Sequence, residues 1–304
     1  MHQASGGGRH LDLFREARGG VAGRVNSSLS ETPDQYGVAG HPISHSWSPF
    51  IHGMFAKATA QNLVYRLFDI RPENFRGEAL RLFAGGLKGL NVTLPHKQAA
   101  AELVNELTPR AERAKAVNTI AFFEQTSLLG DNTDGLGLMA DLENNLGIAL
   151  AGKRVLILGA GGAVRGVLGS LMERELKQVV IANRTPDRAR KLAAEFADLG
   201  EISGCGFAEV EGPPYDLIIN ATSASLQGEM PEMPVGLVGE ESICYDMAYG
   251  RGHTPFTLWA KSLHAARTTK GWGMLVEQAA ESFLLWRGIR PDTSSALEAL
   301  AQHA

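Results

Sequence analysis

Several features that would point to a specialised class of protein are scarce in this sequence. Only two cysteines occur in 304 residues, Cys205 and Cys244, too few for a disulfide framework and without the spacing of a metal site. No apolar run approaches the roughly 18 residues that a membrane-spanning helix needs. The formal net charge of −4 leaves no broad cationic surface for nucleic acid or an anionic membrane. We expect a globular cytoplasmic protein with neither kind of partner, whose cysteines are small buried residues in a reducing compartment.

The first 34 residues differ from the rest, because they are rich in glycine, serine and arginine. They lack the continuous apolar segment of a secretion signal, and their acidic side chains balance their arginines, unlike those of a transit peptide. We expect residues 1–34 to form a flexible tail without chemistry of its own, with at most a short helix over 10–18.

From residue 36 onward, short apolar runs alternate with helical patterns, which is typical of parallel sheets with crossover helices. We expect strands within 36–40, 63–69, 89–94, 116–124, 127–135, 178–184, 215–223, 242–249 and 265–273. Helices are expected over 48–57, 72–86, 96–107, 136–147, 186–200, 274–287 and 292–303, and 153–175 should form a strand, a turn and a helix.

This pattern predicts an α/β fold with two domains. We expect a three-layer substrate domain with a mainly parallel sheet, formed by 35–133 together with 273–304. A Rossmann-like dinucleotide domain should span 134–272. Whether the chain is a monomer or a homodimer is left open.

A glycine-rich turn marks the second domain. The run "RVLILGAGGAVRG" puts this turn directly between a buried strand and a helix, and the turn comprises Gly159, Ala160, Gly161, Gly162 and Ala163. Glycines permit the tight bend and let main-chain amides approach a pyrophosphate at the helix N-terminus. Such turns can also join a strand to a helix without binding a ligand, but this context favours a dinucleotide site.

The end of the next strand indicates which dinucleotide is bound. An NAD site usually has Asp or Glu there to bind the ribose 2′-hydroxyl. This sequence has Asn183, Arg184 and Thr185, with Arg188 one helical turn later. Because guanidinium groups bind phosphate through charge-assisted hydrogen bonds, the pattern predicts NADP as the cofactor.

Polar side chains follow the apolar segments of the first domain. The run "GLNVTLPHK" ends a strand-like segment at Pro95 and delivers Lys97 there, and similar polar ends occur at 41–49, 116–119 and 130–135. Because the carboxyl ends of parallel strands gather at one edge of a sheet, these groups predict a polar rim that binds a polyhydroxylated molecule.

The order and spacing of these runs resemble the shikimate dehydrogenase family. The resemblance covers the chain from residue 36 to the C-terminus and is carried by "HSWSP", "GLNVTLPHK", "AVNT", "GDNTDG", "GAGGA", "NRT", "NATS", "YDMAY" and "GMLVEQA". It implies NADP-dependent interconversion of 3-dehydroshikimate and shikimate in aromatic amino acid biosynthesis. No metal is implied.

The resemblance also implies roles for individual residues. Lys97 matches the catalytic lysine of the family and Asp134 its carboxylate partner. The substrate contacts match Ser46, Ser48, Asn91, Thr93, Asn118, Tyr249 and Gln278. Besides the glycine turn and the run from Asn183 to Arg188, the cofactor contacts match Met247 and Gly271.

The predicted catalytic pair makes chemical sense without the family. Hydride reduction of a ketone leaves an alkoxide, which a positioned lysine ammonium can stabilise and protonate. A neighbouring carboxylate would orient that ammonium. An isolated lysine is usually just a solvated surface group, but the hydroxyl-bearing loops and Asp134 favour the catalytic interpretation.

Three departures from the family pattern stand out. Val164 replaces a small residue after the glycine turn, and we expect it to crowd the start of the helix. Lys270 occupies a position where the family commonly has Asp, and "NATSASL" lacks a glycine after its first Ser.

Three other functions compete with this interpretation. A metal enzyme would use His41, His45 and His96, but Pro42 argues against a helix that presents the first two on one face. A quinate or shikimate dehydrogenase using NAD would share the fold and the catalytic pair. A non-catalytic NADP sensor would be expected to have lost Lys97 or its partner.

Overall fold

The structure is a computed structural model that describes residues 32–123, 127–222, 224 and 228–302. Residues 1–31, and with them the short helix expected over 10–18, lie outside the described residues. Asp34, which we assigned to the tail, is the first residue of a strand, because its backbone N–H bonds Asn62 O at 3.1 Å. In the described part of the chain, no helix has both the length and the apolar character of a transmembrane segment.

The first sheet has the strand order β2-β1-β3-β5-β6-β4. These strands are β1 (Asp34–Gly40), β2 (Leu63–Asp69), β3 (Leu87–Val92), β4 (Glu106–Leu107), β5 (Thr119–Phe123) and β6 (Ser127–Asp131). Strand β5 runs antiparallel to both its neighbours, whereas the other pairs are parallel. The helices within this stretch of sequence are α2 (Ser48–Ala58), α3 (Phe75–Ala84), α4 (Lys97–Leu103) and α5 (Pro109–Ala114), with a single 3-10 turn (Pro72–Asn74) before α3.

The second sheet is wholly parallel, with the order β12-β11-β10-β7-β8-β9. Its strands are β7 (Arg154–Leu158), β8 (Gln178–Asn183), β9 (Ile202–Gly206), β10 (Leu217–Asn220), β11 (Ile243–Asp246) and β12 (Arg267–Lys270). The associated helices are α6 (Asp134–Ala140), which continues into a π-helical turn (Asp141–Asn145), α7 (Gly162–Met172), α8 (Pro186–Phe196) and α9 (Pro255–Ser262). Strand order and apolar, buried strands confirm the predicted α/β fold class with mainly parallel sheets.

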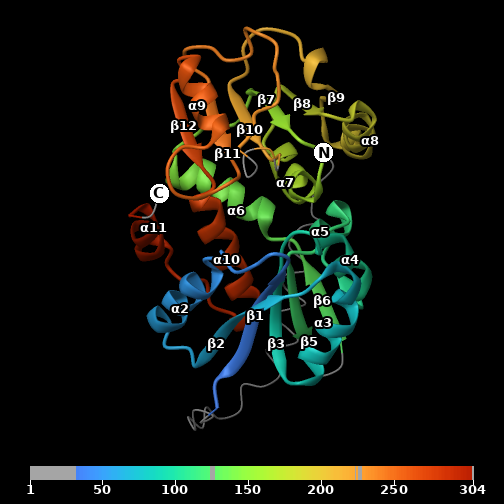
Figure 1. Ribbon diagram of the computed structural model, residues 1–304, viewed down its shortest axis with the longest axis vertical. Helices are drawn as coiled ribbons and strands as arrows, with labels where there is room; N and C mark the ends of the chain where they lie inside the picture. The colour runs from blue at the N-terminus through green and yellow to red at the C-terminus, as the bar shows by residue number, and fades with distance from the viewer. Residues whose placement is uncertain (1–31, 124–126, 223, 225–227, 303–304) are drawn as a thin grey trace, which may run out of the picture. The chain divides into compact units, whose positions relative to one another are not determined.

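Two helices complete the chain, α10 (Trp272–Arg287) and α11 (Ser294–Ala301). Figure 1 shows α10 next to α6, with its later turns leading toward the strands of the first sheet. Trp286, near the end of α10, donates its indole N–H to Ile120 O of β5 at 3.0 Å. The C-terminal segment is thereby anchored to the first sheet, so the residues of α10 are available to a site built there.

One expected helix was wrong in its extent. The helix predicted over 96–107 ends at Leu103, because Val104 is extended and the next residues form β4, which pairs with β6. A separate helix, α5, then begins at Pro109 and was missed. Its N-cap, Thr108, accepts a hydrogen bond from Ala111 N at 3.4 Å, so the Thr-Pro pair was the signal that could have located it.

The contact between α10 and the first sheet depends on a glycine. A Cβ built on Gly89 of β3 would lie 2.4 Å from Trp286 Nε1, and the ring cannot retreat without losing its bond to Ile120. Gly77 of α3 has no atom within 4 Å of a built Cβ.

We therefore expect Gly89→Ala to destabilise the protein by about 1–3 kcal/mol through overpacking. Gly77→Ala, the matched control in an open helical position, should be neutral or stabilise by up to about 1 kcal/mol. Urea denaturation followed by tryptophan fluorescence measures both. Equal midpoints for the two variants would contradict this account of the α10 contact.

Candidate active site

Lys97 lies at the start of α4, just beyond the carboxyl end of β3. Its Nζ is 2.5 Å from Asp134 Oδ2, and the two side chains are only 13% and 7% exposed. The pair that was predicted from the sequence is therefore in direct contact and mostly shielded from water.

Asp134 is held in place by two groups besides the lysine. Its Oδ1 accepts from Asn118 Nδ2 at 2.8 Å, and its backbone N–H donates to Asn132 Oδ1 at 3.1 Å. Each carboxylate oxygen thus has its own partner, so Oδ2 is directed at the ammonium of Lys97.

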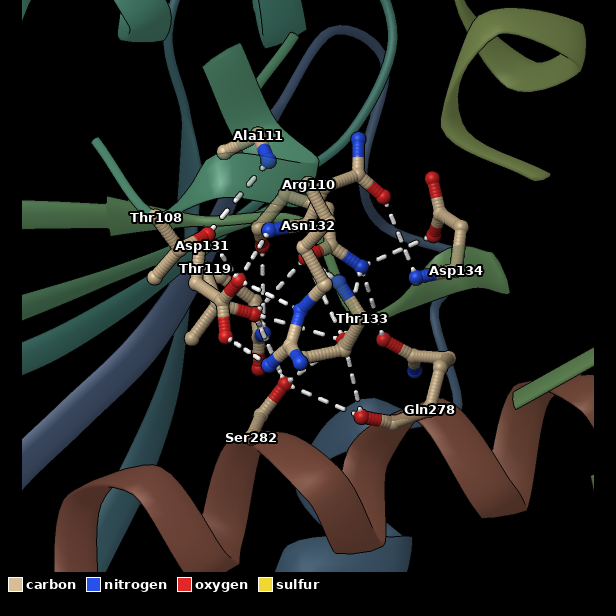
Figure 2. A network of polar contacts seen from close by, with 12 residues as sticks. Thr108, Arg110, Ala111, Thr119, Asp131, Asn132, Thr133, Asp134, Gln278 and Ser282 are labelled. Atoms are coloured by element: carbon tan, nitrogen blue, oxygen red, sulfur yellow. Dashed lines mark hydrogen bonds and ion pairs between the residues drawn. The ribbon is translucent and has the colours of Figure 1, made fainter. Parts of the chain in front are cut away.

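Asn118 makes several bonds within a polar network, and Figure 2 shows its partners Thr133, Asp134 and Gln278 close together. Besides Asp134, its Nδ2 lies 2.9 Å from Thr133 Oγ1 and 3.4 Å from Gln278 Oε1. Its Oδ1 accepts from Thr133 N and from Thr119 Oγ1, each at 2.8 Å. These bonds join β5, the turn after β6 and helix α10 around one amide.

A buried carboxylate supports the turn that leads into Asp134. Asp131 is fully buried, and its Oδ1 accepts from Arg110 Nε at 2.7 Å, Thr108 Oγ1 at 2.6 Å and Asn132 N at 2.7 Å. Arg110 Nη2 also bonds the second oxygen, Oδ2. This bidentate pair fixes the residues that directly precede Asp134.

Asn91 lies behind this network and makes its bonds within the protein. Its Nδ2 is 3.0–3.2 Å from Ser282 Oγ, Thr119 Oγ1 and Asn118 O, and its Oδ1 accepts from Tyr65 Oη at 2.7 Å. The buried side chain of Asn91 thus supports the position of Asn118, and the substrate contact implied for Asn91 stays a prediction.

Ser46 and Ser48 lie side by side, with their hydroxyl oxygens 3.2 Å apart. Ser48 N also donates to Ser46 Oγ at 3.3 Å. Neither hydroxyl caps α2, whose N-cap is Trp47 without a side-chain capping bond. Ser46 Oγ donates to Ser48 Oγ, so the two hydroxyls form one polar point at the start of α2.

An aromatic cluster connects this serine pair to Tyr249. The Trp47 ring, between the serines, lies 5.8 Å from the Trp272 ring, which in turn lies 5.1 Å from the Tyr249 ring. Burial raises the pKa of Tyr249, which keeps its hydroxyl protonated at neutral pH. Two further predicted substrate residues, Thr93 just past β3 and Gln278 on α10, come from elements that border the network.

The glycine turn after β7 has the expected geometry. Gly159 has φ +111° and a built Cβ would lie 3.2 Å from Ala221 O, so a side chain would be strained there. Gly161 is the N-cap of α7, and built Cβ atoms on Gly161 and Gly162 meet nothing within 4 Å. The turn that also contains Ala160 and Ala163 therefore presents a bare helix start to a pyrophosphate.

Val164 does not crowd that helix start, contrary to the expectation. Its side chain is fully buried in the core between α7 and the second sheet. The branched residue contributes to the packing of this core.

Two exposed arginines follow β8. Arg184 and Arg188 make no ion pair with any described residue, whereas Arg190 pairs with Asp187 at 3.1 Å and Glu209 at 2.9 Å. Asn183 Nδ2 donates to Thr185 O at 3.0 Å and shapes the turn. Guanidinium groups at this strand end suit a phosphate on the ribose.

Met247 and Gly271 lie against each other at the ends of β11 and β12. A Cβ on Gly271 would be 2.5 Å from Met247 O, so only glycine allows this approach. Met247 N in turn donates to Asn220 O of β10 at 2.8 Å.

The histidines considered as metal ligands have other partners. His41 Nδ1 is 2.6 Å from Asp69 Oδ1, and His96 bonds Ile70 O at 2.7 Å while stacking on Phe75. His45 is exposed. Within the described residues, no group of three or more His, Cys, Asp or Glu side chains could hold a metal ion.

Sequence reasoning missed several supporting residues. Tyr65 and Ser282 both bond Asn91, yet the latter is 191 residues away along the chain. His52 stacks on Tyr65 with ring centroids 4.2 Å apart, and burial lowers its pKa to about 3. Local sequence patterns carry no signal for such distant partners. His52 is the exception, because it lies in the run "HSWSPFIH" that also contains Ser46 and Ser48.

Three family models match, described as the shikimate dehydrogenase substrate binding domain at 38–120, shikimate / quinate 5-dehydrogenase at 141–230 and the shikimate 5′-dehydrogenase C-terminal domain at 271–301. The NADP(+) shikimate dehydrogenase of Aeromonas hydrophila is 53% identical over 270 residues, which is 89% of this chain and 98% of that protein. The corresponding enzyme of Methylococcus capsulatus is 50% identical over 268 residues, 88% of this chain and 96% of that protein.

A solved structure shares the fold over nearly the same extent. Shikimate 5-dehydrogenase from Thermus thermophilus, in complex with NADP(H) and shikimate, superposes with a TM-score of 0.78 at 34% identity. The match covers 88% of this chain and 99% of that one.

The buried His52 predicts how stability depends on pH. Its pKa is about 3 in the folded protein and near 6.5 in the unfolded chain, so only the unfolded chain binds a proton at intermediate pH. The free energy of unfolding should therefore keep its full value above pH 6.5 and decrease as the pH drops toward 3. His52 contributes up to about 1.4 kcal/mol of this decrease per pH unit.

His52→Phe should remove this contribution while retaining the stacking. Urea denaturation at pH 7, 6 and 5 measures the free energy of unfolding of both proteins. Between pH 6 and pH 5, the wild type should lose about 1 kcal/mol more of it than the variant does. His45→Gln is the exposed control and should follow the wild type. A difference between His52→Phe and wild type that stays constant with pH would contradict the assignment.

Proposed function

The chain belongs to the shikimate dehydrogenase family, and we propose that it catalyses the reversible NADPH-dependent reduction of 3-dehydroshikimate to shikimate. The reaction is a step of aromatic amino acid biosynthesis. One observation carries the proposal, namely the contact of Lys97 with Asp134 at the edge of the first sheet. A cytoplasmic location fits the two cysteines, both of which are free thiols.

We infer that residues 35–133 with 273–304 bind the substrate and that 134–272 bind the cofactor. The bare start of α7 and the exposed Arg184 and Arg188 fit an NADP molecule. When bound, the reduced nicotinamide supplies the hydride. The protein must orient the ketone and provide the proton.

Lys97 is the proton donor in this proposal. In the reductive direction its ammonium stabilises the developing alkoxide and then transfers a proton to it, and in the oxidative direction it accepts that proton. Asp134 keeps the ammonium in place and, being fixed by Asn118, does so without reorganising during the reaction. Shielding from water strengthens both interactions.

The substrate is recognised at two points. The hydroxyls of Ser46 and Ser48, 3.2 Å apart, donate to the carboxylate of the substrate. The other polar contacts, to the ring hydroxyls and the carboxylate, come from Asn91, Thr93, Asn118, Tyr249 and Gln278. The two serines carry no charge, so this site would bind the carboxylate through hydrogen bonds alone. A hydrogen bond to a charged group is worth about 1.5–3 kcal/mol.

Two competing functions share the fold and differ at particular residues. A non-catalytic sensor is disfavoured because the catalytic pair is intact and in contact. An NAD-dependent quinate or shikimate dehydrogenase is disfavoured because the end of β8 carries exposed arginines and has no acidic residue at Asn183, Arg184 or Thr185.

Replacing the lysine tests the mechanism. We expect Lys97→Ala to lower kcat for shikimate oxidation by at least about a hundredfold, because proton transfer loses its positioned group, with only a modest change in KM. Lys88→Ala removes an exposed lysine from β3 and should leave kcat unchanged. A near-normal kcat for Lys97→Ala at neutral pH would show that the lysine takes no part in proton transfer.

Replacing an arginine tests the cofactor assignment. Arg184→Ala should raise KM for NADP by about tenfold or more, since a charge-assisted bond to the 2′-phosphate is lost, and should leave NAD kinetics nearly unchanged. Arg190→Ala is the matched control, because Arg190 is already paired with Asp187 and Glu209. Added salt should weaken NADP binding more than NAD binding. If Arg190→Ala lost as much NADP affinity as Arg184→Ala, the 2′-phosphate site would be elsewhere.

A further inference from the structure

Lys270 is the departure from the family pattern that the proposed mechanism does not use. It ends β12 and directly precedes Gly271 and Trp272. Its Nζ donates to Gly250 O at 2.8 Å and to Gly252 O at 2.7 Å. Both carbonyls belong to the loop of residues 247–254, which connects β11 to α9 and carries Met247 and Tyr249.

The two ends of this loop are fixed independently of Lys270. At its start, Ala248 N donates to Asp246 Oδ1 at 3.1 Å, and Gly271 N donates to Ala248 O at 3.2 Å. At its end, Thr254 Oγ1 donates to Asp246 Oδ2 at 2.6 Å and caps α9. The middle of the loop is the part that Lys270 reaches.

The backbone of the loop is bent so that both carbonyls face one ammonium. Gly250 has φ +155° and Gly252 has φ +71°, conformations that favour glycine. A single lysine on the neighbouring strand can therefore bridge two turns of the loop. Burial lowers the pKa of Lys270 and the charge of Asp246 opposes that shift, so the bridging group is a partly shielded cation.

Tyr249 is adjacent to the bridged segment. Its ring is tilted at 44° to that of Trp272 at 5.1 Å, and Trp272 meets Trp47 at 5.8 Å between the two substrate serines. A shift of Gly250 would move Tyr249 against this cluster, which is close-packed and has little room to absorb it.

We propose that Lys270 is a positioning residue that clamps the 247–254 loop and thereby holds Tyr249 in the substrate site. The inference rests on the proposed function for the role of Tyr249. Lys270 itself does not touch the reacting atoms. Its loss should weaken substrate binding more than it slows the chemical step.

The kinetic test compares three variants with the wild type. Lys270→Met should raise KM for shikimate by about tenfold with kcat within about threefold, which corresponds to loss of one well-placed substrate contact. Lys270→Arg can donate to both carbonyls and should restore KM. Lys177→Met, just before β8, is the matched control, because this lysine is exposed and makes no ion pair with a described residue.

A second readout needs no activity. Arg251 is exposed within the loop, so native-state trypsin cleavage of the Arg251–Gly252 bond, followed by mass spectrometry, reports how firmly the loop is held. Lys270→Met should be cut there several times faster than the wild type and Lys177→Met, whereas Lys270→Arg should resemble the wild type.

The outcomes separate this inference from the proposed function. Equal cleavage in all four proteins would overturn the clamp, whether or not the wild type oxidises shikimate. Faster cleavage of Lys270→Met with an unchanged KM would overturn its role in the substrate site while leaving the proposed function intact. A wild type inactive on shikimate would overturn the proposed function and, with it, the substrate-site role, and the cleavage result would still decide the clamp.

Discussion

The site is arranged around one short contact, 2.5 Å between Lys97 Nζ and Asp134 Oδ2. A lysine and an aspartate that are both largely removed from water are stable as ions only when they are paired and their remaining hydrogen-bonding groups are satisfied. Asn118 meets that condition for the second oxygen of Asp134, and Asn132 bonds its backbone N–H. The surrounding network is therefore required by the ion pair itself, and it fixes the geometry on which the proposed mechanism depends.

Glycines bring α7 next to the Lys97–Asp134 pair. A Cβ built on Gly166, in the second turn of α7, would lie 2.9 Å from Asp134 Oδ2. On the other side of α6, a Cβ on Gly137 would lie 2.6 Å from Gln278 N. Glycines thus let α7 and α10 approach α6 closely near Asp134. Groups proposed to bind the pyrophosphate, hold the proton donor and contact the substrate are consequently joined through one short helix.

Much of this could be predicted from local sequence, because strand and helix periodicity, glycine turns and strand-end polar residues are local signals. The positions of Lys97, Asp134 and Arg184 at the ends of elements follow from such signals. The division of 96–107 into α4 and β4 did not, since the extended conformation of Val104 is set by pairing with β6. The same limit applies to the hydrogen bonds that Asn91 makes within the protein. Its partners Tyr65 and Ser282 are distant in sequence, and only the fold shows that they occupy its side chain.

The central claim is that this protein oxidises shikimate with NADP, and a matrix of steady-state rates tests it most directly. Purified full-length protein would be assayed with shikimate and with quinate, each in the presence of NADP or NAD, and kcat/KM compared. We expect activity with shikimate and NADP and a value at least about tenfold lower with NAD, the difference that one charge-assisted phosphate contact provides. Equal use of NAD, or a preference for quinate, would contradict the claim.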